Sequence, residues 1–223
     1  MPYRCDPAIS AKFEVFLNYP GVWALVNYRI ANRLYKKGFK FLARAIMGIS
    51  QVITSIDIHP GCEIGRRVFI DHGMGVVIGQ TAVIGNDVLI YQQVTLGGVS
   101  LEKGVKRHPT IEDGVVIGGG AKVLGDIVVG ENSKIGANSV VIHDVPKNST
   151  AIGIPARVIQ KGRDRSQFSH NKLPDINKEL FEYIIKRLNV IEEALSEHDE
   201  KLVIEKDREL EKIYEMFIKT IKE

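Results

Sequence analysis

Residues 111–141 read IEDGVVIGGGAKVLGDIVVGENSKIGANSVV, and an aliphatic residue returns at every sixth position of this stretch. The same period extends back to Ile58, with a slip of two residues before Ile78 and a longer gap between Leu96 and Ile111. The period lands on thirteen aliphatic residues: Ile58, Ile64, Ile70, Ile78, Ile84, Ile90, Leu96, Ile111, Ile117, Val123, Val129, Ile135 and Val141. Glycine directly follows seven of them. Such a repeat predicts a parallel β-helix, in which a short strand forms each side of a triangular coil and a corner follows it.

Three six-residue units make one coil, so residues 18 apart are expected on adjacent coils. Ile117 and Ile135 should then pair across strands about 4.8 Å apart. The two interruptions, DHGMGVV from Asp71 and GGVSLEKGVKRHPT from Gly97, both contain a histidine. Insertions in a repeat of this kind emerge at its surface, often on the binding face.

The segment before the repeat has a helical pattern. Asp6 followed by Pro7 predicts a helix start, Pro20 begins a second helix that Gly38 ends, and a third helix runs through about Ser55. Apolar side chains recur there at steps of three and four residues, which predicts a packed helical face. They are Phe13, Phe16, Val22, Leu25, Val26, Ile30, Phe41, Leu42 and Ile46.

Beyond about Lys161 the sequence mixes charged residues with leucine and isoleucine, which predicts two C-terminal amphipathic helices. Their apolar stripes are Ile184, Leu188, Ile191 and Leu195, then Leu210, Ile213, Phe217 and Ile221. We therefore expect three regions: N-terminal helices in 1–55, the β-helix in 56–160, and a linker with C-terminal helices in 161–223.

Composition excludes several classes of protein. The 223 residues carry 30 basic and 27 acidic side chains, a net charge of +3 that gives no reason to expect a nucleic-acid partner. No stretch is long and apolar enough for a transmembrane helix, and the first ten residues lack the apolar core of a signal peptide, so we expect a cytoplasmic protein. Cys5 and Cys62 are too few for a disulfide framework and are expected to be reduced.

The histidines are the first candidates for chemistry. No closely spaced histidine pair suggests a catalytic metal, and we expect none. His72 follows Asp71 at the slip in the repeat and lies 15 residues after Asp57, which places Asp57 and His72 near one corner on successive coils. A carboxylate that orients an imidazole is what a general base requires. The alternative is a histidine hydrogen-bonded for structure only, which is the role we expect for His143.

Six motifs resemble the serine O-acetyltransferases of bacteria and plants. They are RCDPA from Arg4, DIHPG from Asp57, DHGMGVVIGQTAVIG from Asp71, QQVTLGG from Gln92, KRHPTI from Lys106 and GIPARV from Gly153. This family transfers acetyl from acetyl-CoA to the hydroxyl of L-serine, giving O-acetylserine for cysteine synthesis. The resemblance also implies a left-handed β-helix that assembles as a homotrimer, and cysteine as a feedback inhibitor.

The resemblance implies a role for individual residues. His72 is the expected general base and Asp57 its orienting partner. The expected serine-binding residues are Asp6 and Asp71 for the ammonium, and Arg107 and His108 for the carboxylate. The expected acetyl-CoA contacts are Gly98, Gly119, Gly120, Ala137 and Arg157. Attack on the thioester should be direct, because no activated nucleophile accompanies the base and Cys62 is the only cysteine in the repeat.

Three questions stay open at this point. An acyltransferase for a sugar or antibiotic hydroxyl would not need the ammonium and carboxylate receivers at Asp6, Asp71 and Arg107. A structural trimer would not need Asp57, His72 and the long loop together. A trimer is favoured, although the N-terminal helices leave a hexamer open. A complex with O-acetylserine sulfhydrylase is not expected, because the chain ends in Ile221-Lys222-Glu223 rather than in a terminal isoleucine.

Overall fold

The computed structural model describes residues 18–159, 181, 183–189 and 191–192. The chain divides into two compact units, residues 1–173 and 174–223, and each is described by itself. In the second unit the described residues are helical. The expected helix that starts at Asp6 and the expected apolar stripe from Leu210 onward lie outside the described residues. No described helix combines the length and the apolar character needed to cross a membrane.

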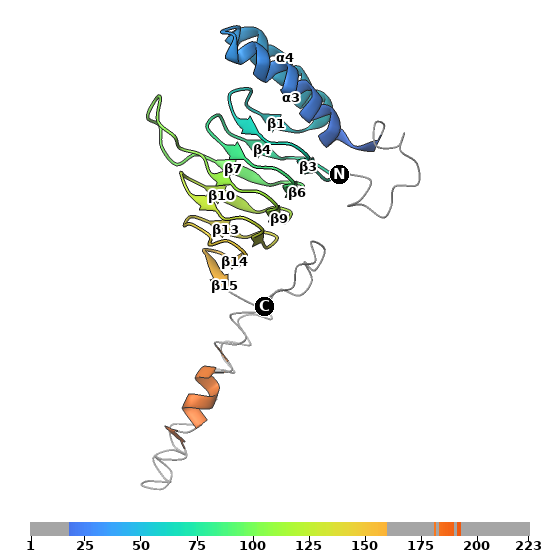
Figure 1. The fold of residues 1–223 in the computed structure, drawn as a ribbon. Coiled ribbons are helices and arrows are strands. Elements are labelled where there is room, and N and C mark those ends of the chain that lie inside the picture. The colour runs from blue at the N-terminus through green and yellow to red at the C-terminus, as the bar shows by residue number, and fades with distance from the viewer. Residues whose placement is uncertain (1–17, 160–180, 182, 190, 193–223) are drawn as a thin grey trace, which may run out of the picture. The chain divides into compact units, whose positions relative to one another are not determined.

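In the described part of the first unit, the helices α3 and α4 precede a left-handed parallel β-helix (Figure 1). Sheet A contains β1 (Asp57–Ile58), β4 (Val77–Ile78), β7 (Thr95–Gly97), β10 (Lys122–Leu124) and β13 (Val140–Val141). Sheet B contains β2 (Glu63–Ile64), β5 (Val83–Ile84), β8 (Thr110–Ile111) and β11 (Val128–Val129). Sheet C contains β3 (Phe69–Ile70), β6 (Leu89–Ile90), β9 (Val116–Ile117), β12 (Lys134–Ile135), β14 (Thr150–Gly153) and β15 (Ala156–Ile159).

The predicted period is confirmed. All thirteen aliphatic positions are buried, and Ile64 is the most exposed of them at 7%. Ile117 pairs with Ile135 in parallel register, as the 18-residue coil requires. Each of the strands β1 to β13 contributes one of these inward side chains, and they stack into the core because the strands of adjacent coils pair in register.

Two of the three corners of the triangle contain most of the expected site residues. The AB corner joins sheet A to sheet B and comprises residues 59–62, 79–82, 98–109 and 125–127. The CA corner joins sheet C to sheet A and comprises residues 71–76, 91–94, 118–121 and 136–139. Figure 1 shows residues 98–109 as the loop that projects from the body before β8.

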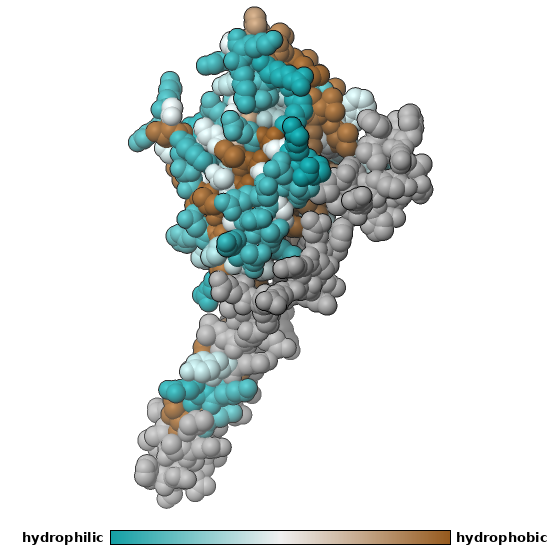
Figure 2. Space-filling model, viewed as in Figure 1, coloured by the Kyte–Doolittle hydropathy of each residue, from teal (hydrophilic) through white to brown (hydrophobic). Residues whose placement is uncertain are grey.

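The helices begin and end close to the predicted residues. α3 spans Pro20–Lys36, with proline at its start, and α4 spans Lys40–Thr54. The predicted packed face is wrong in part, because Val26, Ile30, Phe41 and Leu42 are exposed, Phe41 by 88%. The buried residues of α3 are Gly21, Ala24, Tyr28 and Ala31. α3 lies so close to β3 that a Cβ on Gly21 would lie 2.2 Å from the Ile70 carbonyl oxygen. Figure 2 shows the apolar side chains of this helical end as a brown area on the surface.

α3 also covers the open edge of the first coil. The Tyr28 hydroxyl donates to the Cys62 carbonyl at 2.7 Å, and the Asn32 amide donates to the Pro60 carbonyl at 2.8 Å. The Arg29 guanidinium donates to the carbonyls of Ile64 and Gly65. An exposed strand edge is a template for unwanted pairing, and these donors satisfy carbonyls that have no strand beyond them.

Candidate active site

The CA corner presents His72 to solvent. Here β3 is followed by β4 after eight residues rather than six, and His72 lies in the extra length. Its backbone is left-handed, with φ of 56°, and its N–H donates to the Asp71 carboxylate at 2.9 Å. Asp57, the first residue of β1, lies next to this corner one coil earlier, and its N–H donates to the Val76 carbonyl. The corner therefore combines an exposed imidazole with two carboxylates, one of them bound to the imidazole's own backbone.

A column of residues continues along the CA corner from coil to coil. The N–H of Gln93 donates to the Met74 carbonyl, the N–H of Gly120 to the Gln92 carbonyl, and the N–H of Asn138 to the Gly119 carbonyl. These bonds stack residues 74, 92, 119 and 137 directly above one another.

Glycine is required in this column. Gly120 has a φ of 74°, and a Cβ on it would lie 2.1 Å from the Asn138 side-chain oxygen. A Cβ on Gly119 would lie 2.8 Å from the amide nitrogen of Gln92. The Gln92 side-chain oxygen is buried without a hydrogen-bond partner in the part of the chain that the structure describes. At Gly119, Gly120 and Ala137 the column therefore has little side-chain bulk, and the Gln92 side chain lies beside Gly119.

The AB corner holds His108 at the end of the long loop. The ring is buried, and its Nδ1 lies 2.8 Å from the Thr81 hydroxyl and accepts the Thr81 backbone N–H at 3.2 Å. A ring nitrogen that accepts from a backbone N–H carries no proton, so in the neutral ring the proton lies on Nε2. Burial, and then the charges of Arg107 and Lys106, lower the pKa of His108. The ring is therefore a neutral hydrogen-bond donor through Nε2.

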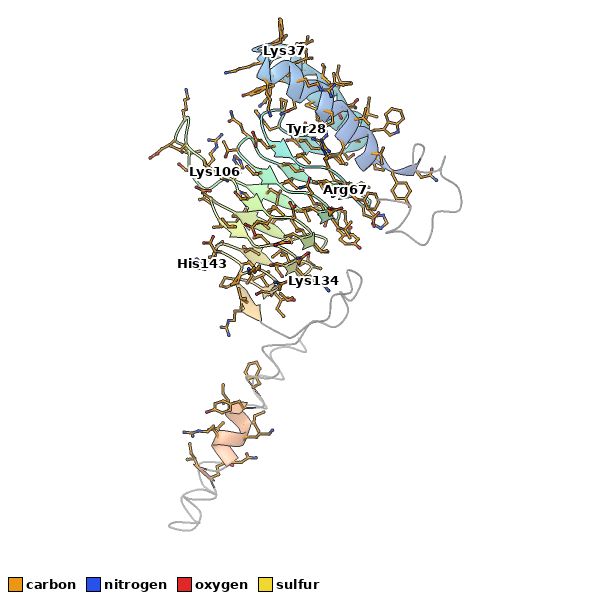
Figure 3. The ribbon with its side chains drawn as sticks, viewed as in Figure 1. Tyr28, Lys37, Arg67, Lys106, Lys134 and His143 are labelled. Atoms are coloured by element: carbon orange, nitrogen blue, oxygen red, sulfur yellow. The ribbon has the colours of Figure 1, made fainter. Side chains whose placement is uncertain are left out.

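Two glycines make room for this ring. A Cβ on Gly79 would lie 2.0 Å from Nε2 of His108, and one on Gly98 would lie 3.1 Å from the same atom. Lys106, at the loop side of the body (Figure 3), donates to the His108 carbonyl at 2.6 Å and pairs with Asp126 at 3.2 Å. His108 is thus closely enclosed, with Gly79 and Gly98 next to its ring and Lys106 bound to its carbonyl.

Arg107 is a cation held by neutral groups. Its guanidinium donates to the Ser100 carbonyl at 3.3 Å and, at 3.5 Å, to the side-chain oxygen of Gln80. Among the described residues no carboxylate lies within ion-pair distance of it. A guanidinium fork without a carboxylate partner is suited to an anionic ligand.

His59 is a second neutral imidazole at the AB corner. It packs edge-on against Tyr35 of α3, and its Nδ1 accepts the Gly61 N–H at 2.9 Å. Burial and the nearby positive charges, Arg44 first, lower its pKa to about 4. Gln80 links the same region to Tyr35 through a 3.3 Å hydrogen bond.

The two corners lie at opposite ends of the sheet A strands. A strand of two or three residues, such as β4 (Val77–Ile78), separates them within each coil. His72 and Arg107 therefore lie at different corners of the same chain. Cys62 lies in the core, and burial raises the pKa of its thiol to about 12, so it is not a thiolate at neutral pH. No group of three potential metal-binding side chains is found among the described residues.

Comparison with known proteins decides the family. Residues 108–143 match the family described as bacterial transferase hexapeptide (six repeats). The serine acetyltransferase of Bacillus subtilis strain 168 is 53% identical over 199 residues, which cover 88% of this chain and 91% of the relative. The chain belongs to the serine acetyltransferase family.

Solved structures of serine acetyltransferases agree with this. The soybean enzyme complexed with serine has a TM-score of 0.68 and 45% identity, covering 71% of this chain and 65% of the soybean chain, slightly less than two thirds of it. A complex with cysteine has a TM-score of 0.71 and 42% identity, with 77% and 66% coverage of the two chains. A complex with CoA has a TM-score of 0.66 and 45% identity, with 71% and 64% coverage.

The residues expected from the serine acetyltransferase resemblance fall into two groups. Those at or next to the CA corner are Asp57, Asp71, His72, Gly119, Gly120 and Ala137. Gly98, Arg107 and His108 are at the AB corner. Arg157 is exposed on β15, and the turn before it approaches the CA corner, where the Gly153 N–H donates to the Ser139 hydroxyl at 3.1 Å. Asp6 lies outside the described residues.

Sequence reasoning missed the residues that support these two groups. Thr81 and Gln80 contact His108 and Arg107, Tyr35 contacts both Gln80 and His59, and Gln92 lies against Gly119. The repeat offered one signal: Ile58 and Ile78 pair in register, so His59 and Gly79 follow at equivalent positions of adjacent coils. No spacing rule links Thr81 to His108, because the long loop interrupts the period between them.

Proposed function

We propose that this protein transfers the acetyl group of acetyl-CoA to the hydroxyl of L-serine. The proposal rests on the groups found at the two corners. The CA corner has the exposed imidazole of His72 beside carboxylates. The AB corner has the Arg107 guanidinium, without a carboxylate partner among the described residues, beside the imidazole donor His108. An amino-acid zwitterion needs receivers of both signs as well as a base. The solved relatives with serine and with CoA support the same choice of substrates.

His72 acts as the general base. Its ring nitrogen takes the proton of the serine hydroxyl while the hydroxyl oxygen attacks the thioester carbonyl carbon. The tetrahedral intermediate collapses with cleavage of the carbon–sulfur bond, and the CoA thiolate recovers the proton from His72. Asp57 orients the imidazole and stabilises its protonated form. The reaction is direct, since a buried Cys62 thiol with a raised pKa is a poor nucleophile.

Serine is held at its two charged ends. Arg107 and His108 bind its carboxylate, the first by a charged fork and the second through Nε2–H. Asp71, with Asp6, receives its ammonium. Acetyl-CoA follows the column at the CA corner, where Gly119, Gly120 and Ala137 leave the backbone open. Gly98 and Arg157 complete the coenzyme contacts.

The complete site requires two copies of the chain. The CA corner of one copy and the AB corner of the next combine in a homotrimer with cyclic symmetry. The separation of the two corners by a full side of the triangle supports this arrangement. Large exposed apolar side chains on α3 and α4, such as Trp23, Phe41 and Val52, favour self-association and leave a hexamer possible.

Cysteine shares the ammonium and carboxylate of serine and binds the same receivers as an inhibitor. A relative solved with cysteine supports this proposal. The C-terminal residues behind the prediction of no sulfhydrylase complex lie outside the described residues.

The test is acetyl-CoA consumption, followed as free thiol, with L-serine, L-homoserine, a galactoside or no acceptor. Only serine should support rapid turnover. His72→Ala should lower kcat by about 10²- to 10⁴-fold, the usual contribution of a general base. His143→Ala is the matched control, because His143 is an exposed histidine of the same β-helix (Figure 3). Preference for a sugar acceptor, or activity of His72→Ala within twofold of wild type, would reject the proposal.

A further inference from the structure

Thr81 makes an unusual number of contacts with the Arg107–His108 dipeptide. Its hydroxyl oxygen accepts the backbone N–H of Arg107 at 3.0 Å and that of His108 at 3.2 Å. The same oxygen lies 2.8 Å from Nδ1 of His108, and the Thr81 backbone N–H donates to that nitrogen at 3.2 Å. One residue on the second coil thus binds both the backbone and the ring of a segment 26 and 27 residues later.

These contacts determine where the protons lie. A hydroxyl oxygen that accepts two backbone N–H groups directs its own proton to a remaining acceptor, and Nδ1 of His108 is within reach. The backbone N–H of Thr81 can only donate, so it also requires Nδ1 to be an acceptor. Both groups therefore favour the same neutral tautomer, with the ring proton on Nε2 beside Gly79 and Gly98.

The surroundings keep the ring neutral. Burial lowers its pKa most, and the positive charges of Arg107 and Lys106 next to it lower the pKa further. The carboxylate of Asp126 is engaged by Lys106 rather than by His108.

We propose that Thr81 is a positioning residue that fixes His108 as an Nε2–H donor and holds the adjacent Arg107 in register, so that both present to the carboxylate of the amino-acid substrate. The inference rests on the proposed function, since it concerns the same receiver. Thr81 does not contact the substrate, but it determines which ring nitrogen of His108 does.

Two substitutions separate the hydroxyl from the size of the side chain. Thr81→Val keeps the shape and the backbone N–H but removes the acceptor for two N–H groups and the donor to Nδ1. Thr81→Ser keeps the hydroxyl. We expect Thr81→Val to raise the KM for L-serine about 5- to 100-fold, the range for losing one or two hydrogen bonds, while the KM for acetyl-CoA stays within twofold. Thr81→Ser should recover most of the loss, and Thr150→Val is the control, because Thr150 lies on β14 of sheet C and not at the AB corner.

A direct readout does not depend on turnover. ¹⁵N-labelled histidine in the full chain, without ligand, should show His108 with a protonated Nε2 and an unprotonated Nδ1, assigned by comparison with His108→Gln. In Thr81→Val the His108 signal should show mixed tautomers and a titration midpoint closer to the ordinary value.

The proposal fails if the wild-type ring carries its proton on Nδ1, or if Thr81→Val leaves both the serine KM and the His108 spectrum unchanged. If Thr81→Val does not fold, the wild-type spectrum and Thr81→Ser still decide. A protein that acetylates a different acceptor but shows the Nε2–H tautomer would reject the proposed substrate and leave the positioning role intact.

Discussion

Three histidines of one β-helix lie in three different surroundings. His72 is exposed in a left-handed corner beside a carboxylate, whereas His108 is buried and tied to Thr81. His59 is partly buried against an aromatic ring, and its pKa is lowered to about 4. The same side chain is therefore suited to a base at one position and to a neutral donor at the other two, and the environment decides which.

The first residue-scale prediction concerns Arg107. Arg107→Ala should raise the KM for L-serine about ten- to a hundredfold, because a hydrogen bond to a charged group contributes about 1.5 to 3 kcal/mol. Inhibition by cysteine should weaken by a similar factor, since both ligands present the same carboxylate. Initial rates with each substrate varied in turn provide the measurement. Arg66→Ala, an exposed arginine outside both corners, should leave these constants unchanged. An equal loss of acetyl-CoA affinity would instead place Arg107 at the coenzyme.

The second residue-scale prediction concerns the contribution of His59 to the pH dependence of protein stability. Its pKa is about 4 in the folded protein, against an ordinary 6.5, because burial and neighbouring cations disfavour the charged ring. Between these values the unfolded chain binds more protons than the folded one, so stability falls as the pH falls from 6.5 to 4. His59→Asn keeps an acceptor for the Gly61 N–H and removes the titration.

We therefore expect urea unfolding of His59→Asn to depend less on pH between 6.5 and 4 than that of wild type. Some slope should remain, since the lowered pKa of His108 acts in the same direction. His143→Asn, at an exposed position, is the control. Identical slopes for wild type and His59→Asn would show that His59 does not contribute.

At the scale of elements, α3 acts as a lid on the first coil through its polar side chains. The prediction is that Arg29→Met lowers the free energy of unfolding by about 1 to 2 kcal/mol, because two carbonyls lose charged donors at a partly exposed site. Arg33→Met is the matched control, since Arg33 is on the same helix, is exposed, and shows no hydrogen bond to the first coil in the described chain. Chemical denaturation of both variants at pH 7 measures the difference. Equal stability of the two would mean that water replaces Arg29 without loss.

At the scale of the whole molecule, the separation of the two corners makes a prediction about mixed assemblies. His72→Ala lacks the proposed base but has an intact AB corner, whereas Arg107→Ala lacks the proposed carboxylate receiver but has an intact CA corner. If each site uses one corner from each of two copies, co-refolded mixtures should regain up to about a quarter of wild-type activity at low serine, as random assembly of a cyclic trimer predicts. The two variants refolded separately and then combined are the control. No recovery in a verified mixed trimer would mean that one chain holds the whole site.

Periodicity alone was sufficient to predict the β-helix and its register. A side chain that must point inward at every sixth position leaves one way to stack the coils, and glycine marks the turns between them. The slip at Asp71 and the loop after Gly97 could be located for the same reason, since each breaks an otherwise regular count. Resemblance then supplied the roles of His72 and Arg107, which spacing could not.

The tertiary structure determined the features that the six-residue period does not predict. The inner faces of α3 and α4 follow from how closely the helices approach the first coil, so small residues such as Gly21 and Ala24 are buried while Phe41 is exposed. Thr81 meets His108 only because the loop between them returns to the same corner, and loop length carries no information about where a chain re-enters. The division of the site between two corners depends likewise on the closed triangle. Local sequence determines which side chain points inward, whereas contacts across coils determine which distant side chain it meets.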